Sequence, residues 1–317
     1  MKEILLAFSA LAVVLVSLKL GFDYRLPAPA VFALYLGLYM AARAWVSRND
    51  EAAETVGADW PTSGPIGKFG QRGLILGFTI SGLFAILNPW QLLQIIAQTV
   101  GNTWLYLRGA GAEDFAKQYE NQTRYRLPFA GEWLVYNGGT RPATSHSWGL
   151  ITQRYAYDCV IAGAQHVRHS GAGTRLEDYY AYGAPILAAA AGTVIKVEDR
   201  ISDAPWVGYG IVDIFARNFA GNHVIIQHAE QEFGFYAHLI KGKILVRPGD
   251  QVAAGQPIGH CGHSGHSSEP HLHFHLQDGP SFYLARGLPI SFSNVLVDGL
   301  AQDSIQPTAG QRLAPAK

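Results

Sequence analysis

The chain has 317 residues, 24 of them basic and 24 acidic, so its formal net charge is zero. This length allows more than one domain, and the balanced charge argues against a nucleic-acid-binding protein, which usually carries a basic excess. Two cysteines exclude a disulfide scaffold, while 49% hydrophobic and only 15% charged residues predict a membrane-embedded part beside a globular part.

Three apolar stretches predict an all-α transmembrane region at the N-terminus: Ile4–Leu18, Ala28–Ala42 and Gly73–Pro89. Each is slightly shorter than the roughly 20 residues that an untilted crossing needs, but flanking Lys and Arg side chains extend the usable length. Buried core helices, or a cleaved signal peptide for the first stretch, are the alternatives. Three such runs in close succession favour uncleaved membrane helices.

The segment from Trp90 to Leu107 is also apolar, but it carries Gln91, Gln94 and Gln98 at helical spacing. This polar stripe predicts an amphipathic segment at the membrane surface or against other helices, with a fourth crossing as the alternative. We therefore assign residues 1–107 to a membrane region and residues 108–124 to a polar linker.

Basic residues predict the orientation of this region. The loop Arg43–Arg72 carries four basic residues, whereas the loop between the first two apolar stretches carries Lys19 and Arg25. The positive-inside rule then places the longer loop in the cytoplasm. Three crossings would make the protein a multi-pass protein of the cytoplasmic (inner) membrane, with everything after about residue 108 outside the cytoplasm.

Residues 125–300 alternate short β-prone runs with glycine-containing turns, which predicts a mainly β domain, a compact antiparallel sandwich or barrel. No P-loop, Rossmann glycine fingerprint or Gly-x-Ser-x-Gly elbow is present in the sequence. Residues 301–317 are predicted to be a mobile tail.

Three histidines alternate in the sequence SSEPHLHFHLQDG: His271, His273 and His275. In a β-strand, alternate residues face the same side, so the three imidazoles would point together. Neutral imidazoles on one face suit zinc, although a strand with one solvated face would carry the same pattern. A hydrolytic zinc site needs about three protein ligands, an open position for water and a general base.

Four segments together resemble the lysostaphin/LytM-type zinc metallopeptidases of the glycyl-glycine endopeptidase family. They are QRYAYD, YGAPILAAAAGTVIKV, GFYAHL and VRPGDQVAAGQPIGHCGHSGHSSEPHLHFHL, in this order. The resemblance covers about residues 125–290. It implies a compact, LytM-like antiparallel β domain with zinc in a groove, and hydrolysis of peptide bonds in the stem peptides or cross-bridges of peptidoglycan.

The resemblance also implies roles for individual residues. The His-x-His motif corresponds to His271 and His273, of which His273 would bind zinc and His271 would be catalytic. The histidine of YAHL, His238, would be the second catalytic histidine, and the metal aspartate corresponds to Asp158. A zinc ion with imidazole and carboxylate ligands lowers the pKa of its water, and a neutral histidine nearby can move the proton.

One departure from the family pattern concerns the remaining ligand. The family has His-x-x-x-Asp, but this chain has Arg154 four residues before Asp158, and a guanidinium cannot bind zinc. Another branch of the family has NGG, then a histidine, then a segment like QRYAYD, which implies His146 as the metal ligand. The alternatives are His166 or His169, or a site with no third histidine.

The other histidines and the cysteines are given less direct roles. We expect His275 to contact a ligand or line the groove, because it lies about 7 Å further along the strand than His273. His228 is expected to be a structural hydrogen-bonding residue, and His266 to line the groove or face water. Cys159 should face away from Asp158, since neighbouring residues of a strand point to opposite sides.

The sequence therefore predicts a membrane-anchored zinc endopeptidase whose partners are peptidoglycan peptides and the lipid bilayer, and no nucleic acid. Arg154 leaves open a non-catalytic LytM-like domain that binds or activates other cell-wall hydrolases. A zinc peptidase that cuts a protein substrate in the membrane is a third possibility.

Overall fold

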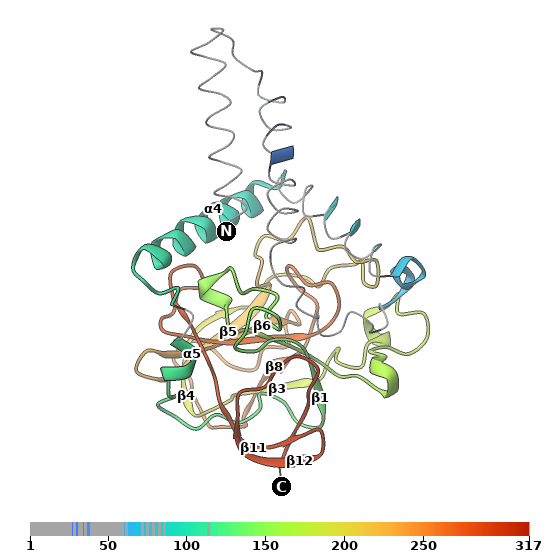
Figure 1. Ribbon diagram of the computed structural model, residues 1–317. Helices are drawn as coiled ribbons and strands as arrows, with labels where there is room; N and C mark the ends of the chain where they lie inside the picture. Colours follow the sequence, from blue (N-terminus) through green and yellow to red (C-terminus); the bar gives the residue numbers. More distant parts are fainter. Residues whose placement is uncertain are drawn as a thin grey trace, which may run out of the picture. The chain divides into compact units, whose positions relative to one another are not determined.

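The C-terminal part of the chain folds mainly into antiparallel β-strands, as the computed structural model shows (Figure 1). The structure describes residues 63–70, 87–112 and 115–316, together with the single positions 27, 30, 34, 37, 38, 60, 73, 76, 77, 80, 81 and 84. The chain divides into two compact units, Met1–Glu54 and Thr55–Lys317, and every element named below belongs to the second unit.

Most of the described strands belong to one 11-stranded sheet. Its order is β12 (Leu300–Ile305), β11 (Phe292–Val297), β13 (Arg312–Pro315), β1 (Trp133–Asn137), β2 (Tyr157–Val160), β9 (Leu272–Gln277), β6 (Glu232–Leu239), β5 (Asn222–Ala229), β4 (Gly192–Glu198) and β7 (Gln251–Val252), and β10 (Gly287–Leu288) pairs with β9. The second sheet consists of β3 (Pro185–Leu187) and β8 (Pro257–His260). The predicted mainly antiparallel β class is thereby confirmed.

Helical segments lie in the connections between strands and before the first strand. The longest described one is α4 (Pro89–Leu107), which begins with Asn88 as its N-cap. The others are the α-helix α5 (Phe115–Gln118) and the 3-10 helices η1 (Pro65–Phe69), η2 (Ile151–Gln153), η3 (Ala164–His166) and η4 (Leu176–Asp178). The domain thus relies on its sheet for most of its regular structure.

The core lies against one face of the central strands. On β9, Leu272, Phe274 and Leu276 are almost completely buried and join a large apolar cluster that includes Tyr157 of β2 and Tyr236 of β6. Alternate residues of a strand point to opposite faces, so this apolar packing fixes the register of β9 and directs its histidines to the other face.

Helix α4 is amphipathic, as the glutamine spacing predicts, and its polar stripe contacts the β domain. Gln91, Gln98 and Asn102 are buried, and their side chains hydrogen-bond to loops of that domain. The alternative of a fourth membrane crossing is therefore wrong for this helix. No helix in the part of the chain that the structure describes is both long enough and apolar enough to cross a bilayer.

The predicted membrane stretches fall mostly outside the described residues. Ile4–Leu18 lies outside them entirely, and Ala28–Ala42 and Gly73–Pro89 are described mainly at single positions, so these crossings stay predictions.

The predicted linker and the predicted tail are both more ordered than expected. The polar linker 108–124 contains α5 and is tied to the domain, where Tyr119 Oη donates to Glu232 Oε1 at 2.7 Å. The mobile tail 301–317 instead contributes most of β12 and all of β13, and β13 inserts between β1 and β11. Leu313 is 1% exposed, so burial of this side chain holds the tail in the sheet.

Candidate metal centre

The register of two strands brings the first pair of candidate ligands together. Strand β2 pairs antiparallel with β9, and Asp158 is the direct partner of His273. The atoms His273 Nδ1 and Asp158 Oδ1 lie 2.9 Å apart, and both residues are buried. Cys159, one residue further along β2, faces the apolar core, as predicted.

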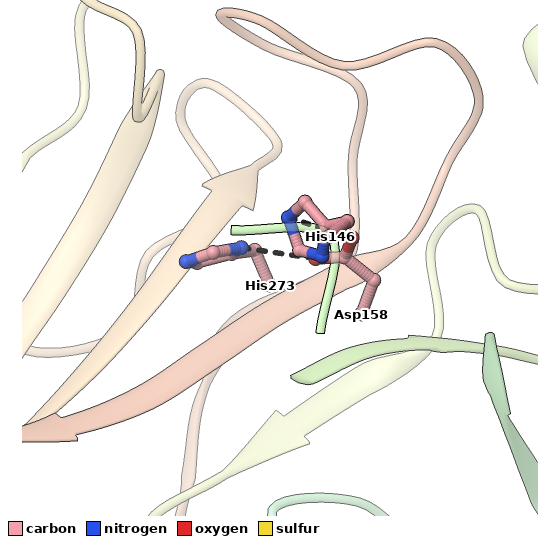
Figure 2. Close-up of side chains that lie close together, drawn as sticks. All are labelled: His146, Asp158 and His273. Carbon is pink, nitrogen blue, oxygen red and sulfur yellow. Dashed lines mark hydrogen bonds and ion pairs between the residues drawn. The ribbon is translucent and has the colours of Figure 1, made fainter. Parts of the chain in front are cut away.

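His146 reaches the same carboxylate from the loop between β1 and η2. Its Nε2 lies 3.4 Å from Asp158 Oδ2, and its side chain is 38% exposed. In Figure 2 His146 and His273 both point toward Asp158, and dashed lines mark the two interactions. Single ligand atoms of the three residues all lie within 4.8 Å of one another. The structure thus gathers the three residues that the sequence predicts as metal ligands.

The loop that carries His146 is held on both sides of this residue. Ser145 Oγ donates to the carbonyl oxygen of Arg154 at 2.8 Å, and Ser147 Oγ donates to that of Gln153 at 2.6 Å. These two hydrogen bonds close the loop onto the segment that leads into β2, which brings a histidine 12 residues before Asp158 beside it.

The electrostatics of Asp158 favour a charged carboxylate. Burial acts to raise its pKa, but His146, His271 and His273 outweigh this effect and hold the pKa well below its ordinary value. Asn137 Nδ2 donates a further hydrogen bond to Asp158 Oδ2 at 3.0 Å. Asp158 is therefore an anionic oxygen ligand at neutral pH, as a divalent cation requires.

A chain of hydrogen bonds fixes which nitrogen of His273 carries a proton. Gln277 Nε2 donates to the carbonyl oxygen of Gly279, so Gln277 Oε1 is the atom that faces His275 Nε2, at 2.9 Å. Burial lowers the pKa of His275 to about 3, so its ring is neutral and its Nδ1 is an acceptor. His273 Nε2 lies 3.1 Å from that Nδ1 and must donate to it.

In the neutral ring of His273, Nδ1 then has a lone pair directed at Asp158 Oδ1. Two acceptors 2.9 Å apart repel each other unless a cation lies beside both, so the arrangement fits a bound metal ion. Two imidazoles and one carboxylate are a common donor set of catalytic zinc sites. The outer position predicted for His275 agrees with its contact to His273.

The two candidate catalytic histidines lie beside this group. The ring centroids of His238 and His271 are 4.7 Å apart, and His271 Nε2 is 3.6 Å from Asp158 Oδ1. His238 Nδ1 lies 2.7 Å from the carbonyl oxygen of Ser264, and His271 Nδ1 lies 2.7 Å from that of Glu269. Because a carbonyl only accepts, both Nδ1 atoms carry the proton when the rings are neutral, and both Nε2 atoms are acceptors.

The environment of His238 keeps its ring neutral. Burial, together with His271 and His273, lowers its pKa well below the ordinary value. Its backbone has a φ of 60°, in the left-handed region, and its backbone N–H donates to Ala220 at 3.1 Å. A neutral imidazole with an unprotonated Nε2 can accept a proton at neutral pH.

The alternative metal ligands lie elsewhere. His166 stacks on Trp60 with a centroid distance of 4.6 Å, and His169 Nε2 accepts a hydrogen bond from the backbone of Gly64 at 3.1 Å. Arg154 is buried, and its Nε and Nη1 donate to the carbonyl oxygens of Trp148 and Gly111. Neither histidine belongs to the group around Asp158, and the arginine contacts main-chain oxygens instead.

The remaining predicted residues have structural contacts. His228 lies 3.0 Å from both the carbonyl oxygen of Ala191 and the hydroxyl of Tyr236, in agreement with its predicted structural role. His266 is half-buried, and its Nε2 lies 2.8 Å from Gln91 Oε1 on α4. The prediction that His266 lines the groove or faces water did not anticipate this helix contact.

Two features of the site are absent from the sequence prediction. Asn137, which contacts Asp158, is the first residue of the NGG sequence, so its position could have drawn attention to it. The buried pair Arg168–Glu269, with Nε to Oε1 at 2.6 Å, is connected to His271 through the carbonyl oxygen of Glu269. No pattern in the sequence links these two residues, which are 101 positions apart.

Comparisons with known proteins agree with this geometry. Residues 172–283 match the model of Peptidase family M23, a range that includes His238, His271 and His273. This chain therefore contains a peptidase family M23 domain and is homologous to the lysostaphin-type peptidoglycan endopeptidases. His146 and Asp158 precede the matched range, and the fold adds them to the site.

Individual relatives cover a limited part of this chain. The peptidoglycan DD-endopeptidase ShyA of Vibrio cholerae is 41% identical over 86 residues, 26% of this chain and 18% of the relative. The glycyl-glycine endopeptidase ALE-1 of Staphylococcus capitis is 35% identical over 86 residues, 26% of this chain and 21% of the relative. The murein hydrolase activator EnvC of Escherichia coli is 30% identical over 108 residues, 33% of this chain and 23% of the relative. The matches thus span about a fifth of each relative's length.

Proposed function

We propose that this protein is a zinc-dependent endopeptidase that hydrolyses peptide bonds in the stem peptides or cross-bridges of peptidoglycan. The observation that carries the proposal is the complete group of His146, Asp158 and His273 with His238 and His271 beside it. A domain that only binds its substrate has no need of two acceptor imidazoles next to a metal-binding group. The relatives with peptidoglycan endopeptidase names support the substrate class.

The chemistry follows from the protonation of the site residues. His146, Asp158 and His273 would hold the zinc ion, which when bound supplies a Lewis acid and lowers the pKa of a water molecule toward neutrality. His271 Nε2, an acceptor near Asp158, can take the proton of the attacking water. His238 Nε2 is the second acceptor, and once protonated either ring can donate to the leaving amine.

We also propose that the protein is anchored in the cytoplasmic membrane, with this domain outside the cytoplasm. The apolar stretches of the first 89 residues support anchoring. So does the outer face of α4, which carries no charged residue and exposes large apolar side chains: Trp90, Leu92, Leu93, Ile95, Ile96, Val100, Trp104, Tyr106 and Leu107. Such a face suits contact with the headgroup and acyl boundary of a bilayer.

The second candidate function is that of an activator of other cell-wall hydrolases. It is favoured by the similarity to the murein hydrolase activator and by Arg154 in place of the family's usual histidine. The argument against it is that another histidine, His146, lies beside Asp158, with its Nε2 3.4 Å from Asp158 Oδ2.

The test uses the purified full-length chain and purified peptidoglycan, with and without a zinc chelator. Release of peptide products that stops with the chelator and returns with added zinc is expected, and the product masses identify the bond. If the protein binds zinc but releases nothing, while stimulating a second hydrolase, the activator function holds. Membrane fractionation, with protease added from outside, tests the location.

A further inference from the structure

Helix α4 has a polar stripe that contacts both halves of the candidate site. Gln91, Gln94, Gln98 and Asn102 recur three or four residues apart and face the β domain, where Gln91 is 0%, Gln98 9% and Asn102 5% exposed. The helix lies beside the β domain and outside the sheet (Figure 1). Burying three of these carboxamides is costly unless each is hydrogen-bonded, so the partners of the polar stripe show what it recognises.

The first half of the stripe binds two loops. Gln91 Nε2 donates to the carbonyl oxygens of Asp213 and Ala216, at 2.8 and 3.1 Å, and its Oε1 lies 2.8 Å from His266 Nε2. Gln94 Oε1 accepts from the backbone N–H of Phe219 at 2.9 Å. These glutamines therefore bridge the loop before β5 and the loop before β9.

These two loops in turn fix His238. The backbone N–H of His266 donates to the carbonyl oxygen of Phe219 at 2.8 Å. Close contact of the loops requires glycine, since a Cβ on Gly265 would lie 2.4 Å from Gly221 N. The carbonyl oxygen of Ser264, in the same loop, accepts from His238 Nδ1 at 2.7 Å. A short series of direct contacts thus connects α4 with the orientation of His238.

The second half of the stripe binds the segment that carries His146. Asn102 Nδ2 donates to the carbonyl oxygen of Gly149 at 3.0 Å, and Asn102 Oδ1 accepts from the backbone N–H of Ile151 at 2.7 Å. Gln98 Nε2 donates to Thr152 Oγ1 at 3.1 Å. The loop of His146 closes onto residues 153 and 154, directly after this segment.

We propose that helix α4 positions residues of the catalytic site. The first half of its polar stripe supports catalysis, and the second half supports zinc binding. Gln91 and Gln94 set the position of His238, while Gln98 and Asn102 set the position of His146. This inference rests on the proposed function for its catalytic part. It follows that damage to the first half slows the reaction with zinc still bound, whereas damage to the second half weakens zinc binding.

The test compares three variants of the full-length chain. Gln91→Leu combined with Gln94→Leu removes the first half, and Asn102→Leu removes the main contacts of the second half. Thr103→Ala is the matched control, because Thr103 is exposed and its Oγ1 donates to the carbonyl oxygen of Thr99 within the same helix. Each variant is measured for kcat on peptidoglycan peptides, for the zinc dissociation constant and for amide hydrogen exchange.

The two variants should change different quantities, kcat in the first and zinc affinity in the second. The double glutamine variant is expected to lower kcat by about tenfold or more, because small displacements of a catalytic group are costly, with its zinc affinity unchanged. Asn102→Leu is expected to weaken zinc binding by about 10–100-fold, as loss of an outer supporting contact does. Exchange should rise at residues 213–221 and 262–267 in the first variant and at residues 146–152 in the second.

Each outcome decides the inference. If both variants match Thr103→Ala in zinc affinity and exchange, α4 positions nothing and the inference is wrong. If each variant alters both halves equally, α4 is only a general stabilising helix, and the inference is wrong as well. If the parent cleaves no peptidoglycan, the proposed function fails, while zinc affinity and hydrogen exchange still decide whether α4 positions the two halves.

Discussion

Asp158 and His273 are direct partners across β2 and β9, although 115 positions separate them in the chain. Their side chains meet because both point to the face of the sheet opposite the apolar core. A one-residue change of register would turn His273 toward the apolar core and Phe274 toward the face that carries Asp158, so packing of the core also specifies the metal-binding pair. His146 is instead positioned by a loop, which Ser145 and Ser147 close onto the segment before β2.

The first prediction concerns the metal ligands. The parent chain is expected to bind one zinc ion, and His146→Ala to bind it at least about 100-fold more weakly, since loss of a ligand exceeds the 10–100-fold effect of outer contacts. His166→Ala is the matched control, because His166 stacks on Trp60 away from the site. Equilibrium dialysis against zinc measures both. Equal binding by His146→Ala and the parent would remove His146 from the ligand set.

The second prediction concerns the hydrogen-bond chain behind His273. His275→Leu removes the acceptor for His273 Nε2, so the proton of His273 is no longer fixed on that nitrogen. Zinc affinity should fall by about 10–100-fold. His260→Ala serves as the control, because His260 is a half-exposed histidine bonded to Lys243. Unchanged affinity in His275→Leu would show that the ligand needs no such support.

The third prediction separates catalysis from metal binding. His238→Ala and His271→Ala should each retain zinc, since neither belongs to the group of His146, Asp158 and His273. Each should lower kcat by about 10²–10⁴-fold, the usual contribution of a general acid or base. Initial rates on purified peptidoglycan, beside zinc analysis of the same samples, provide the measurement. Full activity in either variant would exclude that histidine from proton transfer.

How much of the molecule could be predicted differs between its parts. The alternation in β9 and the resemblance to a known family were sufficient to predict the strand and the roles proposed for its histidines. The position of His146 depended on a loop closure through Ser145 and Ser147, which leaves no periodic signal in the sequence. The resemblance to one branch of the family, rather than any pattern, pointed to it.

The tail and α4 illustrate a second limit. A four-residue strand such as β13 carries too few residues for its period to be recognised. Its partner β1 is distant in sequence, and β12 lies in the chain between β13 and its other partner, β11. The glutamine stripe on α4 correctly predicted an amphipathic helix. The stripe did not reveal what the helix contacts, because a carboxamide can hydrogen-bond to loop carbonyl groups, as here, or to many other polar groups.

The fourth prediction concerns Arg154, which occupies the position of the family's usual histidine. Arg154→Ala should still bind zinc, with affinity lowered by no more than the about 10–100-fold effect of an outer contact, because its guanidinium donates to Trp148 in the loop of His146 and to Gly111 rather than facing Asp158. It should lower the free energy of unfolding by about 1–3 kcal/mol, since two partly buried carbonyl groups lose a charged donor. Urea denaturation and zinc titration measure the two quantities. Loss of zinc without loss of stability would contradict the structural role.

The last prediction is a loss of stability in acid that arises from buried histidines. Burial lowers the pKa of His223 and of His263 to about 4, from an ordinary value of 6.5. Above pH 6.5 these rings are neutral in both states. Between pH 6.5 and 4 the unfolded chain binds protons at them and the folded chain does not, so the free energy of unfolding decreases as the pH falls.

His223 allows this effect to be measured at a residue outside the group of His146, Asp158 and His273. It is 2% exposed, stacks on Phe235, and its Nδ1 lies 2.9 Å from the carbonyl oxygen of Gly221. Each such histidine lowers the free energy of unfolding by about 1.4 kcal/mol for every pH unit of acidification, once that histidine is protonated in the unfolded chain. Urea denaturation at pH 7, 6 and 5 should therefore give a smaller slope for His223→Gln than for the parent. Identical slopes would mean that His223 takes up its proton equally in both states, in conflict with its burial.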